Sequence, residues 1–256
     1  MKYMEFGAGR GETILLLHGG GLSWWNYREA AALLQREHHV ILPILDGHAG
    51  SDRPFTTIGA NAAEIISFIE EELGGSVKLI GGLSLGAQIL LEMLSQRGDI
   101  CSYALAESAA VIPSNTTEAL IGPALGCSYG LIRQKSFARL QFKSLHIKEP
   151  LFEDYYRDTC LITKQDMTAF LRANASYSLR EDIARTSAEV HVFYGDREPR
   201  LIRRSAEAIV KMLPSCTVHR LNGLYHGEFS INNAQKYADA IENIVRGGHP
   251  SPVRDR

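Results

Sequence analysis

Cysteine is sparse in this 256-residue chain, and its four copies stand far apart without a CxxC pair. That spacing excludes a structural zinc site and a disulfide scaffold, so we expect reduced, mostly buried thiols. Long apolar runs are missing too: no stretch approaches the length of a membrane span, and the N-terminus has no apolar segment of signal-peptide length. These absences predict a soluble protein of the cytoplasm. The four cysteines are Cys101, Cys127, Cys160 and Cys216.

An excess of charge of either sign is absent as well. Lys and Arg number 27 and Asp and Glu 29, which gives a formal net charge of −2, and the basic residues are scattered. We therefore expect neither nucleic acid nor a membrane as a partner. The chain does have 45% hydrophobic residues, enough at this length for one α/β domain with a substantial core and no second complete domain. The sequence leaves a homodimer open.

The chain is organised around residues 77–88, where a β-branched and leucine-rich run passes through glycines into an apolar stretch with helical spacing. This pattern predicts a strand, a sharp turn and a helix, with Ser84 at the apex between Gly82 and Gly86. Glycine is needed at both flanks because a side chain there would collide with neighbouring chain. The helix that follows directs its N-terminal N–H groups towards an oxyanion formed beside the serine. The alternative interpretation is a strand-to-helix connection without chemistry.

Further apolar runs are typical of buried strands in a parallel sheet. The segments between them have apolar residues at helical spacing, which predicts regular alternation of strands and helices on both sides of the central turn. The strands are expected at residues 13–17, 40–45, 103–112, 190–194 and 216–221, the third of them running to Pro113.

The alternation lapses between residues 113 and 186, where we expect helices over 117–145 and 152–180. An excursion of this size between two buried strands predicts a helical cap over the carboxyl edge of the sheet. The chain is thus divided into a core, residues 1–112 and 187–256, and a cap, residues 113–186. The cap's basic residues are interpreted as a solvated face that could also attract an acidic substrate. They are Arg133, Lys135, Arg139, Lys143 and Lys148.

Three candidate catalytic groups follow the ends of three strands, where the carboxyl ends of a parallel sheet converge. Ser84 needs a base within hydrogen-bond reach, and His226, after the last strand, can supply it. The imidazole in turn needs a carboxylate to fix its tautomer. The loop after residue 194 offers two acids, Asp196 and Glu198.

Other histidines and acids have structural interpretations. His191 and His219 fall within predicted strands, and residues 38–39 are expected at an exposed helix end. His18 is interpreted as a structural loop residue. Asp46 and His48 are interpreted as turn chemistry, because two ligand types in one loop fall short of a metal site.

From residue 13 to residue 245 the chain resembles the α/β-hydrolase superfamily, with its Gly-x-Ser-x-Gly nucleophile elbow and its chain order of serine, acid and histidine. The resemblance implies an α/β-hydrolase fold: a mostly parallel central sheet, helices on both faces and an inserted helical cap. The run from His18 to Gly20 resembles the family's oxyanion loop, which implies that Gly20 and Leu85 donate backbone N–H groups, with Gly21 as an extra donor.

The acid departs from the family's commonest pattern, in which an aspartate stands three residues after the glycine that ends the strand. That position holds Glu198, which we favour. Asp196 competes because it has the usual residue type, and otherwise it is a turn former.

These features predict a serine hydrolase that cleaves a carboxylic ester or thioester of a small to medium-sized substrate through an acyl-enzyme. Neither a metal nor an organic cofactor is expected. The alternatives are a ligand-binding receptor or scaffold on the same fold, and an acyltransferase.

Overall fold

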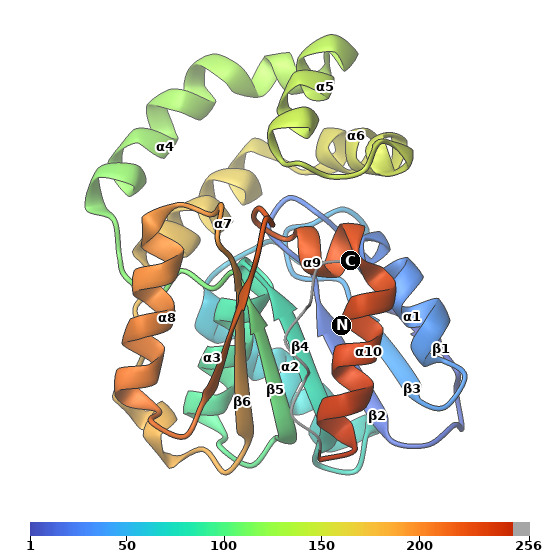
Figure 1. Ribbon diagram of the computed structural model, residues 1–256. Helices are drawn as coiled ribbons and strands as arrows, with labels where there is room; N and C mark the ends of the chain where they lie inside the picture. Colours follow the sequence, from blue (N-terminus) through green and yellow to red (C-terminus); the bar gives the residue numbers. More distant parts are fainter. Residues whose placement is uncertain (248–256) are drawn as a thin grey trace.

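The computed structural model describes residues 1–247, whose strands form one seven-stranded sheet in the order β1-β3-β2-β4-β5-β6-β7. Every neighbouring pair is parallel except β1 with β3, which is antiparallel. The strand that precedes Ser84, β4, lies in the middle of the sheet between β2 and β5 (Figure 1). The strands are β1 (Tyr3–Phe6), β2 (Thr13–Leu17), β3 (His39–Pro43), β4 (Val77–Leu83), β5 (Cys101–Glu107), β6 (Glu189–Gly195) and β7 (Thr217–Leu221).

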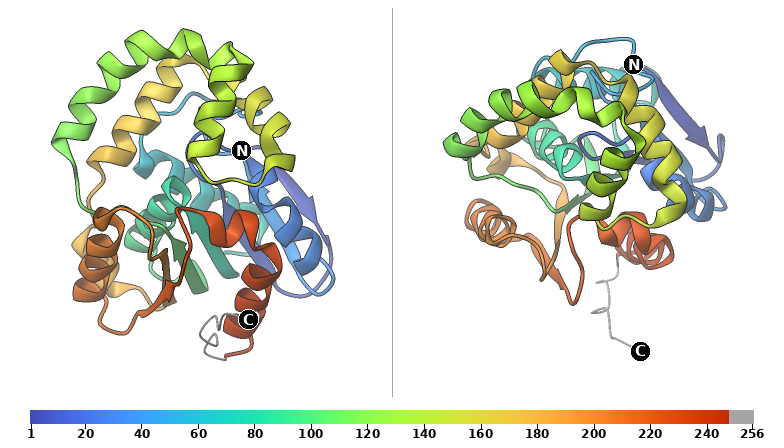
Figure 2. Two further views of the ribbon diagram at one scale, coloured as in Figure 1. Left: turned by 45° about the horizontal axis from the view of Figure 1, so that its top comes forward. Right: turned by 90° about the horizontal axis from the view of Figure 1, so that it is seen from above.

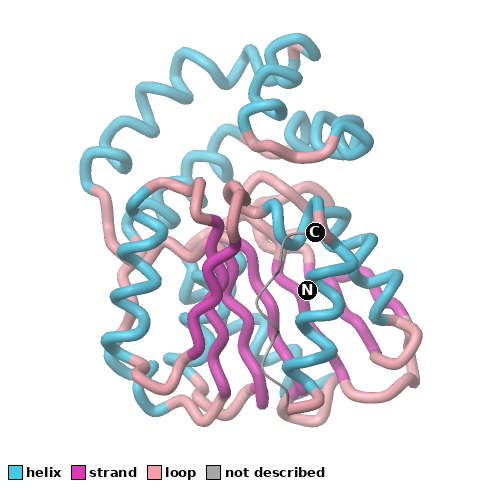
Figure 3. Tube along the Cα trace, viewed as in Figure 1, coloured by secondary structure: helices cyan, strands magenta, loops and turns pink. Residues whose placement is uncertain are grey.

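Helices cover both faces of the sheet (Figure 3). On β2, Leu15 and Leu17 join one core with α2, α3 and α8, while Ile14 and Leu16 join the other core with α1 and α10. Burial on both faces explains why residues 13–17 are a continuous apolar run. No helix within residues 1–247 has both the length and the apolar character that crossing a membrane requires. The helices of these layers are η1 (Trp24–Tyr27), α1 (Arg28–Leu34), α2 (Ile58–Glu72), α3 (Leu85–Gln96), α8 (Arg200–Met212), α9 (Glu228–Asn232) and α10 (Ala234–Val245).

Strands at the predicted positions are confirmed as β2, β3, β4, β6 and β7, but the strand expected to run to Pro113 is wrong in its second half. β5 ends at Glu107, because Ser108 takes a φ of 56° that an extended strand cannot continue. Beyond it the chain leaves the sheet and packs against α8, where Val111 N donates to Ser205 Oγ at 3.0 Å. The edge strand β1 has no counterpart among the predicted strands.

Between β5 and β6 the chain forms a group of helices that lies above the edge where the parallel strands end (Figures 1 and 2). The helix predicted over 117–145 is divided by η2, and the one predicted over 152–180 is divided at Thr163, whose hydroxyl accepts from Asp166 N at 3.0 Å and caps α7. The division into core and cap stays a prediction, and its last segment, 187–256, extends beyond the described residues. The elements of this group are α4 (Asn115–Ser128), η2 (Tyr129–Arg133), α5 (Lys135–Ser144), η3 (Glu149–Leu151), α6 (Phe152–Leu161) and α7 (Lys164–Ser176), and η4 (Glu181–Arg185), which follows them, packs against α3.

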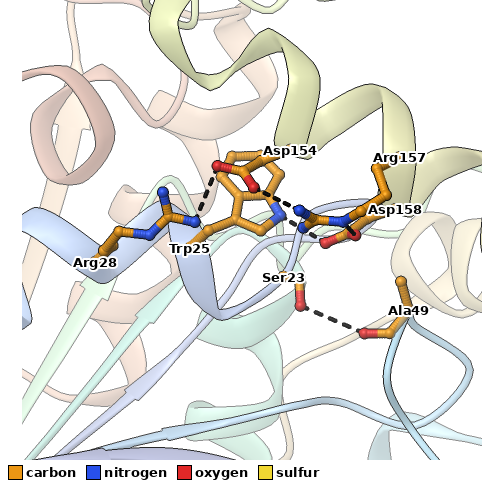
Figure 4. Close-up of polar contacts among 7 residues, drawn as sticks. All are labelled: Ser23, Trp25, Arg28, Ala49, Asp154, Arg157 and Asp158. Atoms are coloured by element: carbon orange, nitrogen blue, oxygen red, sulfur yellow. Dashed lines mark hydrogen bonds and ion pairs between the residues drawn. The ribbon is translucent and has the colours of Figure 1, made fainter.

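A buried polar contact connects α6 to η1, the short helix that precedes α1 (Figure 4). Trp25 Nε1 donates to Asp158 Oδ2 at 2.8 Å, and Arg157 Nε donates to the other oxygen at 2.6 Å. Arg28 reaches Asp154, one turn earlier in α6, at 2.9 Å. Because Trp25 and Asp158 are both buried, breaking their contact leaves an unpaired polar group away from water.

Two expectations about residue environments are wrong. Cys101 is buried, but Cys127 is exposed and the other two thiols are half-buried, so the cysteines are not mostly buried. His38 is buried rather than exposed and lies 3.1 Å from Glu242, and His39 begins β3.

Candidate active site

Ser84 lies at the sharp turn between β4 and α3, with a φ of 53° and a ψ of −110°. Such a conformation costs a non-glycine residue about 1–3 kcal/mol and persists only where the surroundings enforce it. A Cβ on Gly82 would lie 2.4 Å from Gly86 O, and one on Gly86 would lie 2.1 Å from Leu17 O. Glu107 O accepts from Ser84 N at 2.9 Å. The crowding predicted for both glycines is confirmed, and the turn holds Ser84 at the carboxyl edge of the sheet.

The imidazole of His226 and the carboxylate of Glu198 are in contact, with Nδ1 and Oε2 2.7 Å apart. The other carboxylate oxygen accepts from Gly195 N at 2.7 Å and from Ser108 Oγ at 2.9 Å. The Glu198 side chain is 1% exposed and that of His226 42%. A carboxylate fixed in this way can hold the Nδ1–H tautomer and leave Nε2 as the acceptor. Ser108 is absent from the predicted site, and its only sequence signal is its place directly after a buried strand.

Asp196, the competing acid, has other partners. Its Oδ1 accepts from Gly223 N at 2.8 Å, and its Oδ2 lies 3.2 Å from Arg220 Nη2. The structure therefore places Glu198 against His226 and Asp196 between the loop after β6 and the loop after β7.

Backbone hydrogen bonds hold these two loops together. Arg197 N donates to Leu224 O at 3.1 Å, and Asp196 N donates to Leu221 O at 3.0 Å. A Cβ on Gly195 would lie 2.1 Å from Leu224 O, so only glycine allows this close approach. The end of β6 and the loop after β7 thus form one unit that presents the acid and the histidine.

One pocket joins the predicted catalytic groups. It has a volume of about 480 Å³, and Ser84, Glu198 and His226 all line it. The volume is within the range of small-molecule sites. Among residues 1–247, no three His, Cys, Asp or Glu side chains are grouped so that they could hold a metal ion. The apolar wall of the pocket consists of Leu22, Leu83, Leu145, Ile147 and Ile231.

The glycine loop after β2 lies against the turn that carries Ser84. A Cβ on Gly20 would lie 3.5 Å from Leu85 Cβ, so the two predicted oxyanion donors are neighbours. Within the described part of the chain, the Gly20 N–H donates no hydrogen bond and is available to an oxyanion. Gly21, expected as an extra donor, instead donates its N–H to His48 Nε2 at 3.0 Å. The Gly21 N–H is thus already hydrogen-bonded, and Gly20 and Leu85 stay the predicted pair.

Two buried histidines hold this loop. Leu45 N donates to His18 Nε2 at 3.1 Å and Gly21 N to His48 Nε2, so both rings carry their proton on Nδ1. Burial lowers the pKa of His18 to about 3 and that of His48 to about 4, which keeps both imidazoles neutral at neutral pH. His48 also stacks on Phe170 of α7, with ring centroids 4.6 Å apart. His48 therefore links the glycine loop to α7, a role that its interpretation as turn chemistry misses.

Glu107, at the end of β5, is a buried carboxyl that no sequence pattern singles out. Ser230 N donates to its Oε1 at 3.3 Å, while Oε2 has no hydrogen-bond partner within the described residues. Burial raises the pKa of Glu107 to about 7, although its contact with Ser230 opposes this rise. The nearby Glu198 raises this pKa further and His226 lowers it. A second titratable carboxyl thus lies within electrostatic reach of the acid–histidine pair.

Three comparisons relate this chain to known proteins. The sequence profile described as "Alpha/beta hydrolase family" matches residues 14–240. Lipase 3 of Moraxella sp. (strain TA144) is 24% identical over 237 residues, covering 88% of this chain and 75% of the lipase. The solved structure of an enol-lactonase from Burkholderia xenovorans LB400 has a TM-score of 0.81 at 13% identity, with 96% of each chain covered. That of a thermophilic esterase from Thermogutta terrifontis has a TM-score of 0.77 at 18% identity, covering 97% of this chain and 93% of the esterase. At these identities the two structures show a shared fold.

Proposed function

The chain belongs to the alpha/beta hydrolase family, and from that premise we propose that it is a serine hydrolase that cleaves a carboxylic ester or thioester. The curated relative is named a lipase and one similar structure is described as an esterase, which favours ester chemistry. The volume and apolar wall of the pocket support a substrate of small to medium size.

In the proposed mechanism, Ser84 Oγ attacks the carbonyl carbon while His226 Nε2 takes the hydroxyl proton. Glu198 accepts the Nδ1–H hydrogen bond and stabilises the imidazolium that forms. The oxyanion of the tetrahedral intermediate accepts hydrogen bonds from Gly20 N and Leu85 N. The imidazolium then protonates the leaving alcohol or thiol. Water activated by His226 releases the acid from the acyl-enzyme.

The observation that carries this proposal is the 2.7 Å contact between His226 Nδ1 and Glu198 Oε2 beside a pocket that Ser84 also lines. A serine hydroxyl is a weak nucleophile at neutral pH and needs an oriented base. A receptor or scaffold on the same fold would have no need of a buried carboxylate behind an accessible imidazole. The strained turn at Ser84 supports the same conclusion, because such strain is retained at functional sites.

The test is labelling of the purified protein by a fluorophosphonate, which reacts with activated serines. We expect the wild type to be labelled and Ser84→Ala and His226→Ala to remain unlabelled. Ser144→Ala is the matched control, because Ser144 lines the same pocket while its hydroxyl donates to Gln141 O at 2.6 Å. Labelling should persist in that variant.

Folded wild-type protein that reacts neither with the probe nor with short-chain p-nitrophenyl esters would contradict the proposal and favour the receptor. Transfer of the acyl group to an added alcohol in preference to water would instead identify an acyltransferase, because both enzymes share the acyl-enzyme.

A further inference from the structure

One cationic side chain lines the pocket without a part in the proposed mechanism. Arg197 stands next to Glu198 in the chain and lines the same pocket. Its guanidinium carbon lies 5.5 Å from the centroid of the Tyr225 ring, which also lines the pocket. Within residues 1–247 this guanidinium makes no ion pair with a carboxylate.

The two acids adjacent in sequence do not pair with Arg197, because Asp196 contacts Gly223 N and Arg220 instead. Both carboxylate oxygens of Glu198 already have partners: Oε2 contacts His226 and Oε1 accepts from Gly195 N and Ser108 Oγ. Arg197 is exposed and pairs with no carboxylate among residues 1–247, and it lines the same pocket as Ser84.

The basic residues of the cap differ from Arg197 in this respect. Three of the five that the sequence singled out are paired with acids, which favours their interpretation as a solvated face over attraction of an acidic substrate. These pairs are Lys135–Glu153, Arg139–Glu149 and Lys148–Glu29.

Two stacked rings form the wall of the pocket next to the guanidinium. His146 of the cap stacks on the Tyr225 ring, with centroids 3.8 Å apart and an interplanar angle of 5°. The loop that carries it is fastened by Asn232, whose Nδ2 donates to His146 O at 2.7 Å and whose Oδ1 accepts from Lys148 N at 3.0 Å. The aromatic surface next to Arg197 is thus formed by the cap and the core together and is in place before a ligand arrives.

The pocket combines a predicted nucleophile, an apolar wall and one unpaired guanidinium. We propose that it selects esters or thioesters that also carry a carboxylate, which Arg197 binds while the reacting carbonyl lies at Ser84. The planar guanidinium can bind a carboxylate through two parallel hydrogen bonds, a geometry that neutral groups do not match. This inference rests on the proposed function, since it names the substrate class of the same site.

The experiment compares pairs of esters that differ in one carboxylate. The pair p-nitrophenyl pentanoate and mono-p-nitrophenyl glutarate places the charge on the acyl part. The pair phenyl butanoate and 4-butanoyloxybenzoate places it on the leaving part. The quantity measured is the ratio of kcat/KM for the anionic ester to kcat/KM for the neutral ester. We expect this ratio to exceed one for at least one pair after correction for the rates of the uncatalysed reactions.

Arg197→Gln should lower that ratio by a factor on the order of ten, and Arg197→Lys should lower it less, because a charge remains without the planar fork. The matched control is Arg204→Gln, which removes the same charge from an exposed position of α8 outside the pocket. The ratio should stay near the wild-type value in this control. A loss specific to Arg197 distinguishes direct binding from long-range attraction, which both substitutions weaken.

An equal fall in both Gln variants, or an unchanged ratio in Arg197→Gln, would overturn the inference. Labelled Ser84 together with no preference for either anionic ester would refute this inference alone. Failure to label Ser84 and to hydrolyse any of the four esters would refute the proposed function itself. Thermal unfolding of each variant checks that the protein is folded.

Discussion

Two acids that stand two residues apart at the end of β6 have different environments. Glu198 is buried against His226, whereas Asp196 bonds Gly223 N and Arg220 on the outer side of the loop. We predict that Glu198→Gln lowers kcat by a factor on the order of 10³ to 10⁴, because the His226 tautomer is no longer fixed. Asp196→Asn should retain activity within a few-fold. Steady-state hydrolysis of p-nitrophenyl butanoate measures both, and the reverse pattern would make Asp196 the acid.

The sequence could favour Glu198 by its position but could not show which acid turns inward. That outcome depends on the loops after β6 and β7, whose backbones bond between Arg197 and Leu224. The role of Ser108 cannot be predicted for the same reason, since it contacts Glu198, which lies 90 residues later in the chain. Local patterns identify residue types at the edge of the sheet, while tertiary contacts assign their partners.

The role of His48 gives a second prediction at the scale of the residue. His48→Phe keeps a ring that can stack on Phe170 but leaves the half-buried Gly21 N–H without its acceptor. A fully buried unsatisfied donor costs about 1–3 kcal/mol, so the cost here is at the lower end of that range. We expect the glycine loop to shift and kcat to fall by about tenfold to a hundredfold, as when oxyanion donors are misplaced. Ester hydrolysis measures the loss.

His48→Gln supplies the control, because its side-chain oxygen can accept from Gly21 N. It should recover part of the activity that His48→Phe loses. Equal activity in all three proteins, with unchanged folding, would show that the loop does not need this acceptor.

At the scale of the element, a buried hydrogen bond between Trp25 and Asp158 attaches α6 to η1. Asp158→Ala leaves the buried Trp25 Nε1–H unpaired and removes a partner of Arg157. We predict a loss of about 1–3 kcal/mol in the free energy of unfolding and faster proteolysis within residues 129–163. Denaturant unfolding and limited proteolysis measure these effects.

Asp158→Asn retains an oxygen that can accept from Trp25 and should lose less stability than Asp158→Ala. Asp239→Ala, an exposed acid of α10, controls for the loss of a negative charge. Unaltered stability and cleavage in Asp158→Ala would mean that α6 is held by apolar packing instead.

The elements that the sequence predicted best are those buried on both faces or on one regular stripe. β2, β4 and the amphipathic α10 follow their patterns because their environments are uniform along their length. Predictions were poorer in the cap, where the interrupted helices have few buried residues; α4 buries Leu125 alone among its residues. The end of β5 is not predicted, because the positive φ of Ser108 ends the extended strand and the apolar residues after it do not reveal that conformation.

For the whole molecule, buried titratable groups make stability depend on pH in opposite directions. Burial lowers the pKa of His18 to about 3 and of His48 to about 4 from an ordinary 6.5, so the unfolded chain binds more protons at acid pH. Their contribution is complete above pH 6.5 and is lost as the pH falls. Glu107, with a pKa raised to about 7 from 4.5, binds its proton more tightly when folded. Its contribution is complete below pH 4.5 and is lost as the pH rises through 7.

Glu107→Gln isolates one of these opposing effects. Glutamine has nearly the shape of the protonated acid, so the two proteins should be about equally stable at pH 4.5. Above pH 7 the wild type must keep a buried charge whose Oε2 has no partner among residues 1–247. The variant lacks this charge and should be more stable there by about 3 kcal/mol, because the pKa of Glu107 rises from 4.5 to about 7 on folding and each pKa unit corresponds to about 1.4 kcal/mol. Denaturant unfolding at pH 4.5, 6 and 8 measures the difference in the free energy of unfolding between variant and wild type. The control is Glu71→Gln, at an exposed position of α2, for which this difference should be the same at all three pH values. A difference that does not change with pH would show that Glu107 titrates as an ordinary acid.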